Sequence, residues 1–169
     1  MTFPFYPSLL VDVIAVVPYS RNSRTHSVDQ IKQIARSIQE FGFTNPVLLD
    51  ANRNLIAGHG RLEAARLLNI PQIPAITLPH LSDAQKQALR IADNRIALSA
   101  GWDDALLHTE LGDLRDAGFD LALTGFDEME LSDMLDDPGF GPVGSDEQGR
   151  LDERAPVTCP HCGHSFSPA

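Results

Sequence analysis

Cysteine and long apolar runs are both scarce in this chain of 169 residues. Its two cysteines, Cys159 and Cys162, lie close together near the C-terminus and cannot staple a secreted fold. No uninterrupted apolar run approaches the ~18 residues that a membrane-spanning helix needs. The N-terminus also lacks the basic and apolar regions of a signal peptide. These absences exclude a disulfide-stapled fold and a membrane partner, and they favour a cytoplasmic protein.

Basic residues are scarce in the second part of the chain. Residues 101–169 hold three Lys/Arg and sixteen Asp/Glu, whereas residues 1–100 hold ten and seven, so the net charge of −10 comes from the C-terminal part. A mildly basic front part is compatible with a nucleotide or DNA as ligand, and an acidic rear part repels a phosphate backbone. Tight nonspecific binding to DNA by this chain alone is therefore not expected.

Hydrophobic periodicity predicts alternating strands and helices over the first hundred residues. Strands are expected at Leu10–Val17, Val47–Leu49, Leu55–Ala57 and Ile73–Leu78. Between them we expect a loop at Tyr19–His26, a helix capped by Ser27 with Gln30 and ended by Gly42, and a helix at Arg61–Leu68. The order βαββαβ indicates an α+β fold, with a small mixed sheet and flanking helices.

The pattern becomes helical after the last strand. Further helices are expected from a Ser82–Gln85 cap to about Ala97 with Leu89, Ala92 and Ile96 buried, from Asp103 to near Gly118, and from an Asp127–Glu130 cap to Leu135. We therefore expect a core over residues 1–100 and a helical extension over 101–135. A disordered acidic linker follows over 136–158, where glycine, proline and acidic residues dominate, and 159–169 form a C-terminal CxxC fragment.

A glycine turn between a strand and a helix is the most informative local feature. The strand Leu55–Ala57 runs into Gly58-His59-Gly60-Arg61. The two glycines let the backbone approach a ligand without obstruction by a Cβ atom. The N–H groups and the positive end of the following helix attract an anion, and Arg61 adds a bidentate donor. The turn predicts a phosphate site, with an ordinary strand-to-helix turn as the alternative.

Five motifs occur in the order that is typical of ParB-like N-terminal domains. They are Asn22-Ser23-Arg24, the helix end Ser37–Phe43, Asn45-Pro46-Val47, Gly58–Ala65 and Ile91–Arg95. Over about residues 9–135 the chain resembles the ParB/sulfiredoxin superfamily. Within it, the chain is most similar to the ParB-like domains of phages and prophages, which often lie beside DNA methyltransferases or are fused to them. The resemblance implies the ParB/sulfiredoxin fold.

The resemblance also implies a nucleoside triphosphate, CTP or ATP, bound with Mg²⁺. The matching ParB loop, Gly-Glu-Arg-Arg, binds the triphosphate of CTP. The implied nucleotide-binding residues are Asn22, Arg24, Gly58, His59, Gly60, Arg61, Asn94 and Arg95. Asp93 and Asn94 match the Glu-Asn motif of ParB and are the implied Mg²⁺ ligands. Asp93 is one methylene shorter than glutamate, which points to a weaker or water-mediated metal contact; a polar helix face is the alternative.

Catalysis is left open by the sequence. Sulfiredoxin chemistry is excluded, because the turn holds His59 and no cysteine that could form a thiolate. His59 is a candidate acid or base near neutral pH, or else an exposed turn residue. A nucleotide hydrolase, a ParB-like nuclease and a small-molecule kinase that resembles the free-serine kinases of the superfamily are the alternatives. Glu40 and Glu63 are candidate bases for the kinase, or solvated helix faces.

The C-terminal Cys159-Pro160-His161-Cys162-Gly163-His164 looks like one half of a zinc ribbon. Structural zinc needs four ligands, and this segment offers Cys159, Cys162 and His164. A second chain would have to complete the shell, which makes a homodimer one interpretation. An unoccupied CxxC is the other.

An accessory role in DNA metabolism is the function that we expect. The residues beyond 100 are too few and too acidic to supply both the helix-turn-helix reader and the dimerisation domain of a full ParB. Contact with DNA is therefore expected to be indirect or weak. The expected context is DNA modification, packaging or partition in a phage or prophage, with a DNA methyltransferase or terminase as partner.

Overall fold

The structure is a computed structural model that describes residues 5–135, 157–158 and 165–166. Val157–Thr158 (β5) and Ser165–Phe166 (β6) pair as a small antiparallel ladder. The last two residues of the expected acidic linker are therefore in a strand. The rest of that linker, and the candidate zinc ligands Cys159, Cys162 and His164, lie outside the described residues.

A mixed four-stranded sheet forms the centre of the fold. Its strands are Ser8–Asp12 (β1), Val47–Leu49 (β2), Leu55–Ala57 (β3) and Gln72–Thr77 (β4). The order is β1-β4-β2-β3. The central pair β4 and β2 is parallel, and the outer pairs are antiparallel. The predicted hairpin of β2 and β3 is confirmed, together with the order βαββαβ.

The first strand is shorter than predicted. We expected a strand over Leu10–Val17, whereas β1 ends at Asp12 and a 3-10 helix follows at Val13–Ala15 (η1). The Val13 N–H donates to the Pro71 carbonyl at 2.9 Å, which takes the chain out of the ladder with β4. Val17 then forms a separate bridge with Asn54. The apolar run is continuous in the sequence because Val13 and Val16 are both buried in the core after the strand has ended.

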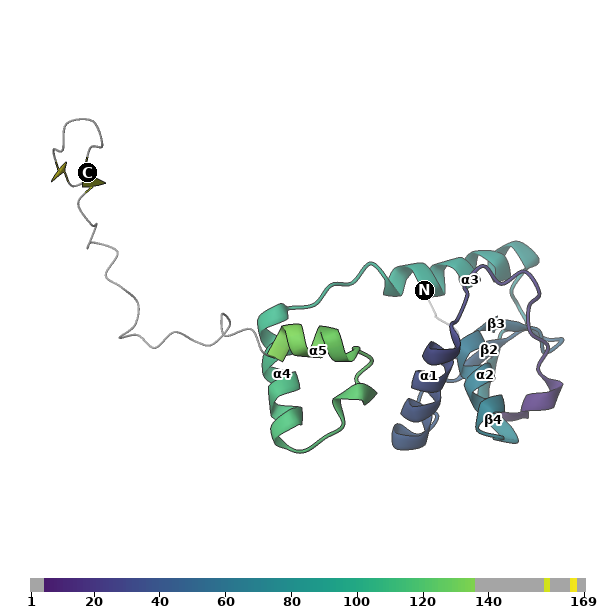
Figure 1. Cartoon of the computed structure of the whole chain (residues 1–169). Coiled ribbons are helices and arrows are strands. Elements are labelled where there is room, and N and C mark those ends of the chain that lie inside the picture. The colour runs from purple at the N-terminus through teal and green to yellow at the C-terminus, as the bar shows by residue number, and fades with distance from the viewer. Residues whose placement is uncertain (1–4, 136–156, 159–164, 167–169) are drawn as a thin grey trace.

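Two helices cover the sheet and close the core. Val28–Phe41 (α1) begins where the Ser27 hydroxyl accepts a hydrogen bond from the Gln30 N–H, and it ends at Gly42, whose φ is +79°. His59–Leu67 (α2) follows β3 and begins two residues earlier than predicted. The buried core residues are Val13, Val16, Val47, Leu49, Leu55, Leu62, Ala65, Ile73 and Ala75. In Figure 1, α1 and α2 lie side by side next to the sheet.

The third α-helix, Asp83–Ala97 (α3), extends away from the core toward its C-terminal end. A capping box of Ser82 and Gln85 begins it as predicted. The helix packs mainly on β3, and Figure 1 shows its C-terminal part extending beyond the sheet. Leu89 and Ala92 are half-buried, but Ile96 is 70% exposed. The prediction that Ile96 is buried was wrong, because the helix outruns the surface against which it packs.

The helical extension is confirmed as a set of short helices. They are Asp104–Asp116 (α4), the 3-10 helix Leu121–Leu123 (η2) and Glu128–Leu135 (α5). Asp103 caps α4, and Asp127 with Glu130 forms the predicted capping box of α5. The extension returns to α1, where the Gln33 side chain donates to the Gly125 carbonyl at 2.8 Å. The rings of Phe41 and Phe119 also lie 6.1 Å apart.

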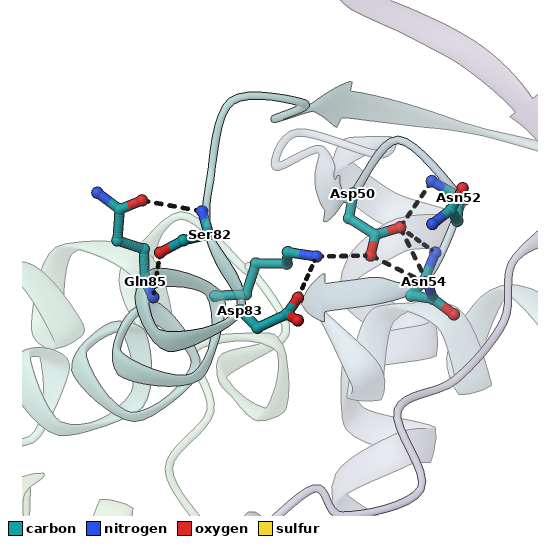
Figure 2. Close-up of polar contacts among 7 residues, drawn as sticks. Asp50, Asn52, Asn54, Ser82, Asp83 and Gln85 are labelled. Carbon is teal, nitrogen blue, oxygen red and sulfur yellow. Dashed lines mark hydrogen bonds and ion pairs between the residues drawn. The ribbon is translucent and has the colours of Figure 1, made fainter.

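A buried carboxylate ties α3 to the turn between β2 and β3 (Figure 2). Asp50 is 5% exposed and accepts hydrogen bonds from the backbone N–H groups of Asn52 and Asn54 at 2.8 and 2.9 Å. Its second oxygen lies 3.3 Å from Lys86 Nζ, and Lys86 also contacts Asp83 at 2.9 Å. Burial alone would raise the pKa of Asp50, but the hydrogen bonds from Asn54, Asn52 and Lys86 outweigh it and lower the pKa.

Replacing the buried carboxylate is expected to destabilise the fold. Asp50→Ala should lower the free energy of unfolding by about 2 kcal/mol, because it leaves the turn N–H groups and the ammonium of Lys86 without their acceptor. Chemical denaturation of the variant and the wild type measures the loss. Asp83→Ala is the matched control, since the Asp83 side chain is fully exposed and its ion pair is worth less than about 1 kcal/mol.

The contribution of Asp50 should also depend on pH. Its pKa is lower in the folded protein than in the unfolded chain, so its stabilising effect is present above the ordinary value of 3.8 and is lost as the pH falls through the folded pKa. The stability difference between the wild type and Asp50→Asn should therefore shrink on acidification. A difference that stays constant from neutral pH down to acid unfolding would contradict this account.

Candidate functional site

The turn between β3 and α2 requires glycine at Gly58 and leaves little room for a side chain at Gly60. Gly58 has a φ of +98°, and a Cβ atom there would lie 2.9 Å from Val47 Cγ1 and 3.0 Å from Arg61 Nε. A Cβ atom on Gly60 would lie 2.8 Å from Ile34 Cδ1. The backbone of the turn is thus pressed between β2, α1 and the side chain of Arg61. This close packing fixes where the first turn of α2 points.

The N-terminus of α2 has no side-chain cap. Gly58 precedes the helix and accepts the first intrahelical hydrogen bond, from the N–H of Leu62 at 2.9 Å. The N–H groups at the start of a helix have no partner within it, and together with the helix dipole they attract an anion. The phosphate site that the glycine turn predicts therefore has the backbone geometry it requires.

A cavity of about 250 Å³ opens at this helix terminus. It gathers residues from the loop before α1, from α1, from the glycine turn and from α3. The lining residues are Asn22, Arg24, His26, Gln30, Ile34, Gly58, His59, Gly60, Arg61, Asp93, Asn94 and Ala97. Eight residues predicted to bind nucleotide or metal are among them, although they come from three separate stretches of sequence.

Three predicted residues lie elsewhere. Arg95 is exposed on α3 and does not line the cavity. Glu63 is half-buried on α2 and pairs with Arg66 at 2.8 Å. Glu40 is exposed near the end of α1. The two carboxylates considered as kinase bases are therefore not on the cavity wall.

Four lining residues were missed by sequence reasoning. His26 and Gln30 join the loop to α1, where His26 Nδ1 and Gln30 Oε1 lie 2.9 Å apart. Gln30 thus bonds to His26 and does not complete the capping box that we predicted with Ser27. A signal was available, because His26 closely follows Arg24 and Gln30 lies one turn further along. For Ile34 and Ala97 there was no such signal, because apolar residues on helices are usually assigned to the core.

Arg61 is the most buried cation of the cavity. Burial lowers the pKa of its guanidinium, and the negative charge of Asp93 opposes this effect. An arginine stays charged under such conditions. Its Nε is buried and has no hydrogen-bond partner among the described residues. A buried charged donor without a partner is costly, which makes Arg61 a candidate ligand for an anion.

His59 is half-buried beside Arg61. Burial lowers the pKa of its imidazole, the positive charges of His26 and Arg90 lower it further, and Glu63 opposes them. The ring is therefore neutral at pH 7. Its Nε2 atom is buried and, within residues 5–135, finds no hydrogen-bond partner. A phosphate oxygen beside the ring would both supply that partner and favour the protonated form.

Asp93 and Asn94 bring oxygen ligands to the cavity from α3. The Asn94 side-chain amide donates to the Arg90 carbonyl at 2.8 Å, which fixes its orientation and leaves its oxygen free for another contact. The carboxylate of Asp93 lies on the same cavity wall. A carboxylate and an amide oxygen beside bound phosphates are a donor set that suits Mg²⁺.

Comparison with known proteins places this architecture in a family. A family model described as the ParB N-terminal domain matches residues 8–95, more than half of the chain. The chain belongs to the ParB N-terminal domain family. A second model, described as the ParB-methyltransferase HTH domain, matches residues 105–160. This match places a helix-turn-helix domain in the part that we expected to be too short and too acidic to hold both such a reader and a dimerisation domain.

The curated relatives match only part of the chain. The ParB-like nuclease domain-containing protein YnaK of Escherichia coli is 51% identical over 70 residues, which cover 41% of this chain and 80% of that protein. The probable plasmid-partitioning protein ParB of Xylella fastidiosa is 32% identical over 92 residues. Those residues cover 53% of this chain and 23% of that ParB, so the chain spans about a quarter of the partitioning protein.

A solved structure confirms the predicted fold. The C-terminally truncated chromosome-partitioning protein ParB of Caulobacter crescentus, complexed with CTP-γ-S, aligns with a TM-score of 0.63. The alignment covers 76% of this chain and 77% of that one at 16% identity, so the likeness concerns the fold. The ParB/sulfiredoxin-like α+β fold is confirmed. In the described part of the chain, no helix is long and apolar enough to cross a membrane.

A side chain at the glycine turn is expected to distort the site. Gly58→Ala should lower the free energy of unfolding by about 1–3 kcal/mol, because it adds a Cβ at positive φ against Val47 and Arg61. Thermal and chemical denaturation measure the effect. Gly112→Ala in α4 is the control, since its Cβ meets nothing within 4 Å and alanine favours a helix by about 1 kcal/mol. Equal stability of the two variants would refute the packing argument.

Proposed function

We propose that the cavity binds a nucleoside triphosphate together with Mg²⁺, and that the chain is a nucleotide-dependent module of a DNA-associated process. The observation that carries this proposal is the glycine turn, which presents an uncapped helix N-terminus beside His59 and Arg61, each with a buried nitrogen that finds no partner among the described residues. The turn and both side chains line one cavity, and helix N–H groups and a guanidinium are groups that bind phosphate.

The phosphates would lie between α2 and the loop before α1. Arg61 contributes a buried guanidinium from α2, and Arg24 faces the same cavity from the loop. The loop is held by Asn22, whose side-chain amide donates to the Arg24 carbonyl at 2.7 Å. A planar guanidinium binds phosphate through two parallel hydrogen bonds, which makes two arginines on one cavity suitable for a polyphosphate.

Magnesium would bind on the α3 side of the phosphates. Asp93 and the free amide oxygen of Asn94 would hold it there, directly or through water. The ion supplies charge neutralisation for the phosphates. The short side chain of Asp93 leaves room for bridging water, which Mg²⁺ commonly retains.

The structural neighbour from Caulobacter supports a nucleotide as the ligand class, because that ParB was solved with CTP-γ-S. CTP is therefore the first nucleotide to test, and ATP the second. The glycine turn itself selects phosphates and not a base. Base preference has to come from other residues of the cavity.

The proposed role in a DNA-associated process is based on the second half of the chain. The match to the ParB-methyltransferase HTH domain covers α4, η2 and α5. We propose that nucleotide binding in the core acts on DNA through this segment, in modification, packaging or partition, with a DNA methyltransferase or terminase as partner. A phage or prophage context and a homodimer belong to the same proposal.

A nuclease is the second candidate, because YnaK is described as a ParB-like nuclease domain protein. Hydrolysis of a phosphodiester would use Asp93 to position a metal-bound water. Incubation of supercoiled plasmid with the protein and Mg²⁺ tests it. Nicking that disappears in Asp93→Ala would favour the nuclease. Plasmid that stays intact would favour the nucleotide-binding module.

Loss of the Arg61 guanidinium is expected to weaken nucleotide binding. Arg61→Ala should lower the affinity about ten- to a hundredfold, which corresponds to roughly 1.5–3 kcal/mol for a charge-assisted contact. Calorimetric titration with each of the four nucleoside triphosphates and Mg²⁺ measures it. Arg66→Ala is the matched control, because Arg66 lies on the same helix, pairs with Glu63 and faces away from the cavity.

The proposal fails if the wild-type protein binds no nucleotide. No heat with any of the four triphosphates at high protein concentration, together with unchanged melting temperature, would be that result. Equal losses in Arg61→Ala and Arg66→Ala would instead assign the effect to net charge.

The Asp93 carboxylate is expected to matter only when Mg²⁺ is present. Asp93→Ala should weaken triphosphate binding in Mg²⁺ and change it little in EDTA, because the carboxylate holds the triphosphate only through the metal ion. The same titrations in the two buffers measure the difference. Asp83→Ala on the same helix is the control. Equal losses in both buffers would show that the carboxylate is structural.

A further inference from the structure

A second cavity lies beside the first along α3. It encloses about 220 Å³ and is lined by Tyr19, Arg21, Asn22, Ser23, Gln87, Arg90 and Ile91. Asn22 lines both cavities, so the two share a wall. We call this the Arg21–Arg90 cavity. Apart from Asn22, its residues do not line the nucleotide site proposed above, although the Arg90 carbonyl accepts the hydrogen bond from the Asn94 side chain.

The charge of this cavity is unbalanced. Arg21 and Arg90 both line it, and no carboxylate does. The same two arginines also line the adjoining cavity toward the β2–β3 turn, together with Asp50 and Asp83, but both of these carboxylates pair with Lys86. Neither arginine has an ion-pair partner among the described residues, although the chain as a whole carries a net charge of −10. The unpaired positive charge is therefore local and is directed at a concave surface.

Tyr19 holds one of the two guanidinium groups in place. The Arg90 guanidinium carbon lies 3.7 Å from the centre of the Tyr19 ring. Stacking occupies a face of the guanidinium, while its N–H donors point outward in its own plane. Arg90 Nε is buried and has no partner in the part of the chain that the structure describes. The stack orients a donor group that the protein itself does not satisfy.

We propose that the Arg21–Arg90 cavity binds a second phosphate ester, next to the glycine turn and independently of it. Arg21 and Arg90 supply the charge, and the amide of Gln87 and the hydroxyl of Ser23 supply neutral hydrogen bonds. Two sources have this chemistry: the backbone of a single-stranded nucleic acid, and a second free nucleotide. The shared wall at Asn22 and the continuation toward Lys86 make a groove along α3 that favours a strand.

Binding of a labelled strand tests the proposal. Fluorescence anisotropy with fluorescein-labelled dT12, at several salt concentrations, compares the full chain with Arg21→Ala and Arg90→Gln. Each variant should bind about three- to tenfold more weakly, and the slope of log affinity against log salt should fall by about 0.7 for each lost phosphate contact. Melting temperatures identify any variant that is unfolded, and Arg21→Ala is the safer of the two because Arg21 is exposed.

Arg36→Ala is the matched control. It removes the same charge from α1, where Arg36 lines a different cavity together with Asp29, Asp127, Glu128 and Glu130. Its affinity for dT12 should equal that of the wild type. If all three variants lose affinity equally, net charge explains the result and the proposal is overturned.

Calorimetric titration with a nucleoside triphosphate distinguishes the two possible sources of the phosphate ester. If the second ligand is a free nucleotide, calorimetry should give two equivalents of triphosphate for the wild type and one for Arg21→Ala, with no change in dT12 binding. If neither dT12 binding nor the nucleotide stoichiometry differs between the folded variants and the wild type, the proposal is overturned. Arg61→Ala keeps this result apart from the proposed function, since it should weaken binding of the first equivalent about ten- to a hundredfold and preserve the effect of Arg21→Ala.

Discussion

The structure depends on the backbone of one glycine. Gly58 turns the chain out of β3 at a positive φ, in a space between Val47 and Arg61 that a Cβ atom would fill. Because of this turn, α2 begins beside the sheet with its N–H groups uncapped, while Leu62 and Ala65 on the same helix enter the core. The anion cradle and the core packing are therefore consequences of one conformation. Any change that relieves the strained turn also moves the cradle.

A second constraint sets the position of the opposite wall. Asp93 and Asn94 lie on a helix that buries none of its residues fully, so packing alone does not hold it. The buried carboxylate of Asp50 holds Lys86 at the start of that helix, and the capping box of Ser82 and Gln85 fixes the end (Figure 2). The wall is thus anchored at one end and open at the other.

Local signals predicted much of this fold, and long-range contacts account for what they missed. The hairpin of β2 and β3 and the boxes at Ser82 and Asp127 follow from side chains within four residues of one another, so the sequence contains them. The end of β1 depends on a hydrogen bond from Val13 to Pro71, which no local pattern encodes. Ile96 fits a helical period, but the period does not show where the sheet ends.

The same distinction holds for the candidate site. The glycine turn was readable because glycines before a helix have a direct physical meaning. Its partners from the loop and α3 were expected through a resemblance and not through spacing. The stack of Arg90 on Tyr19 joins residues 71 positions apart and had no signal at all.

Charge separation within the chain determines which cations are free to bind a ligand. The acidic residues Asp127, Glu128 and Glu130 line a cavity together with Lys32 and Arg36, on the part of α1 that the helical extension approaches. Acidic side chains of the helical extension and basic side chains of α1 therefore line the same cavity. Arg24 and Arg61 share their cavity with a single carboxylate, that of Asp93. Arg21 and Arg90 also line the cavity of Asp50 and Asp83, but both of these carboxylates pair with Lys86. The positive charges along this part of α3 therefore outnumber the carboxylates that line the same cavities, and an anionic ligand would supply the missing counter-charge.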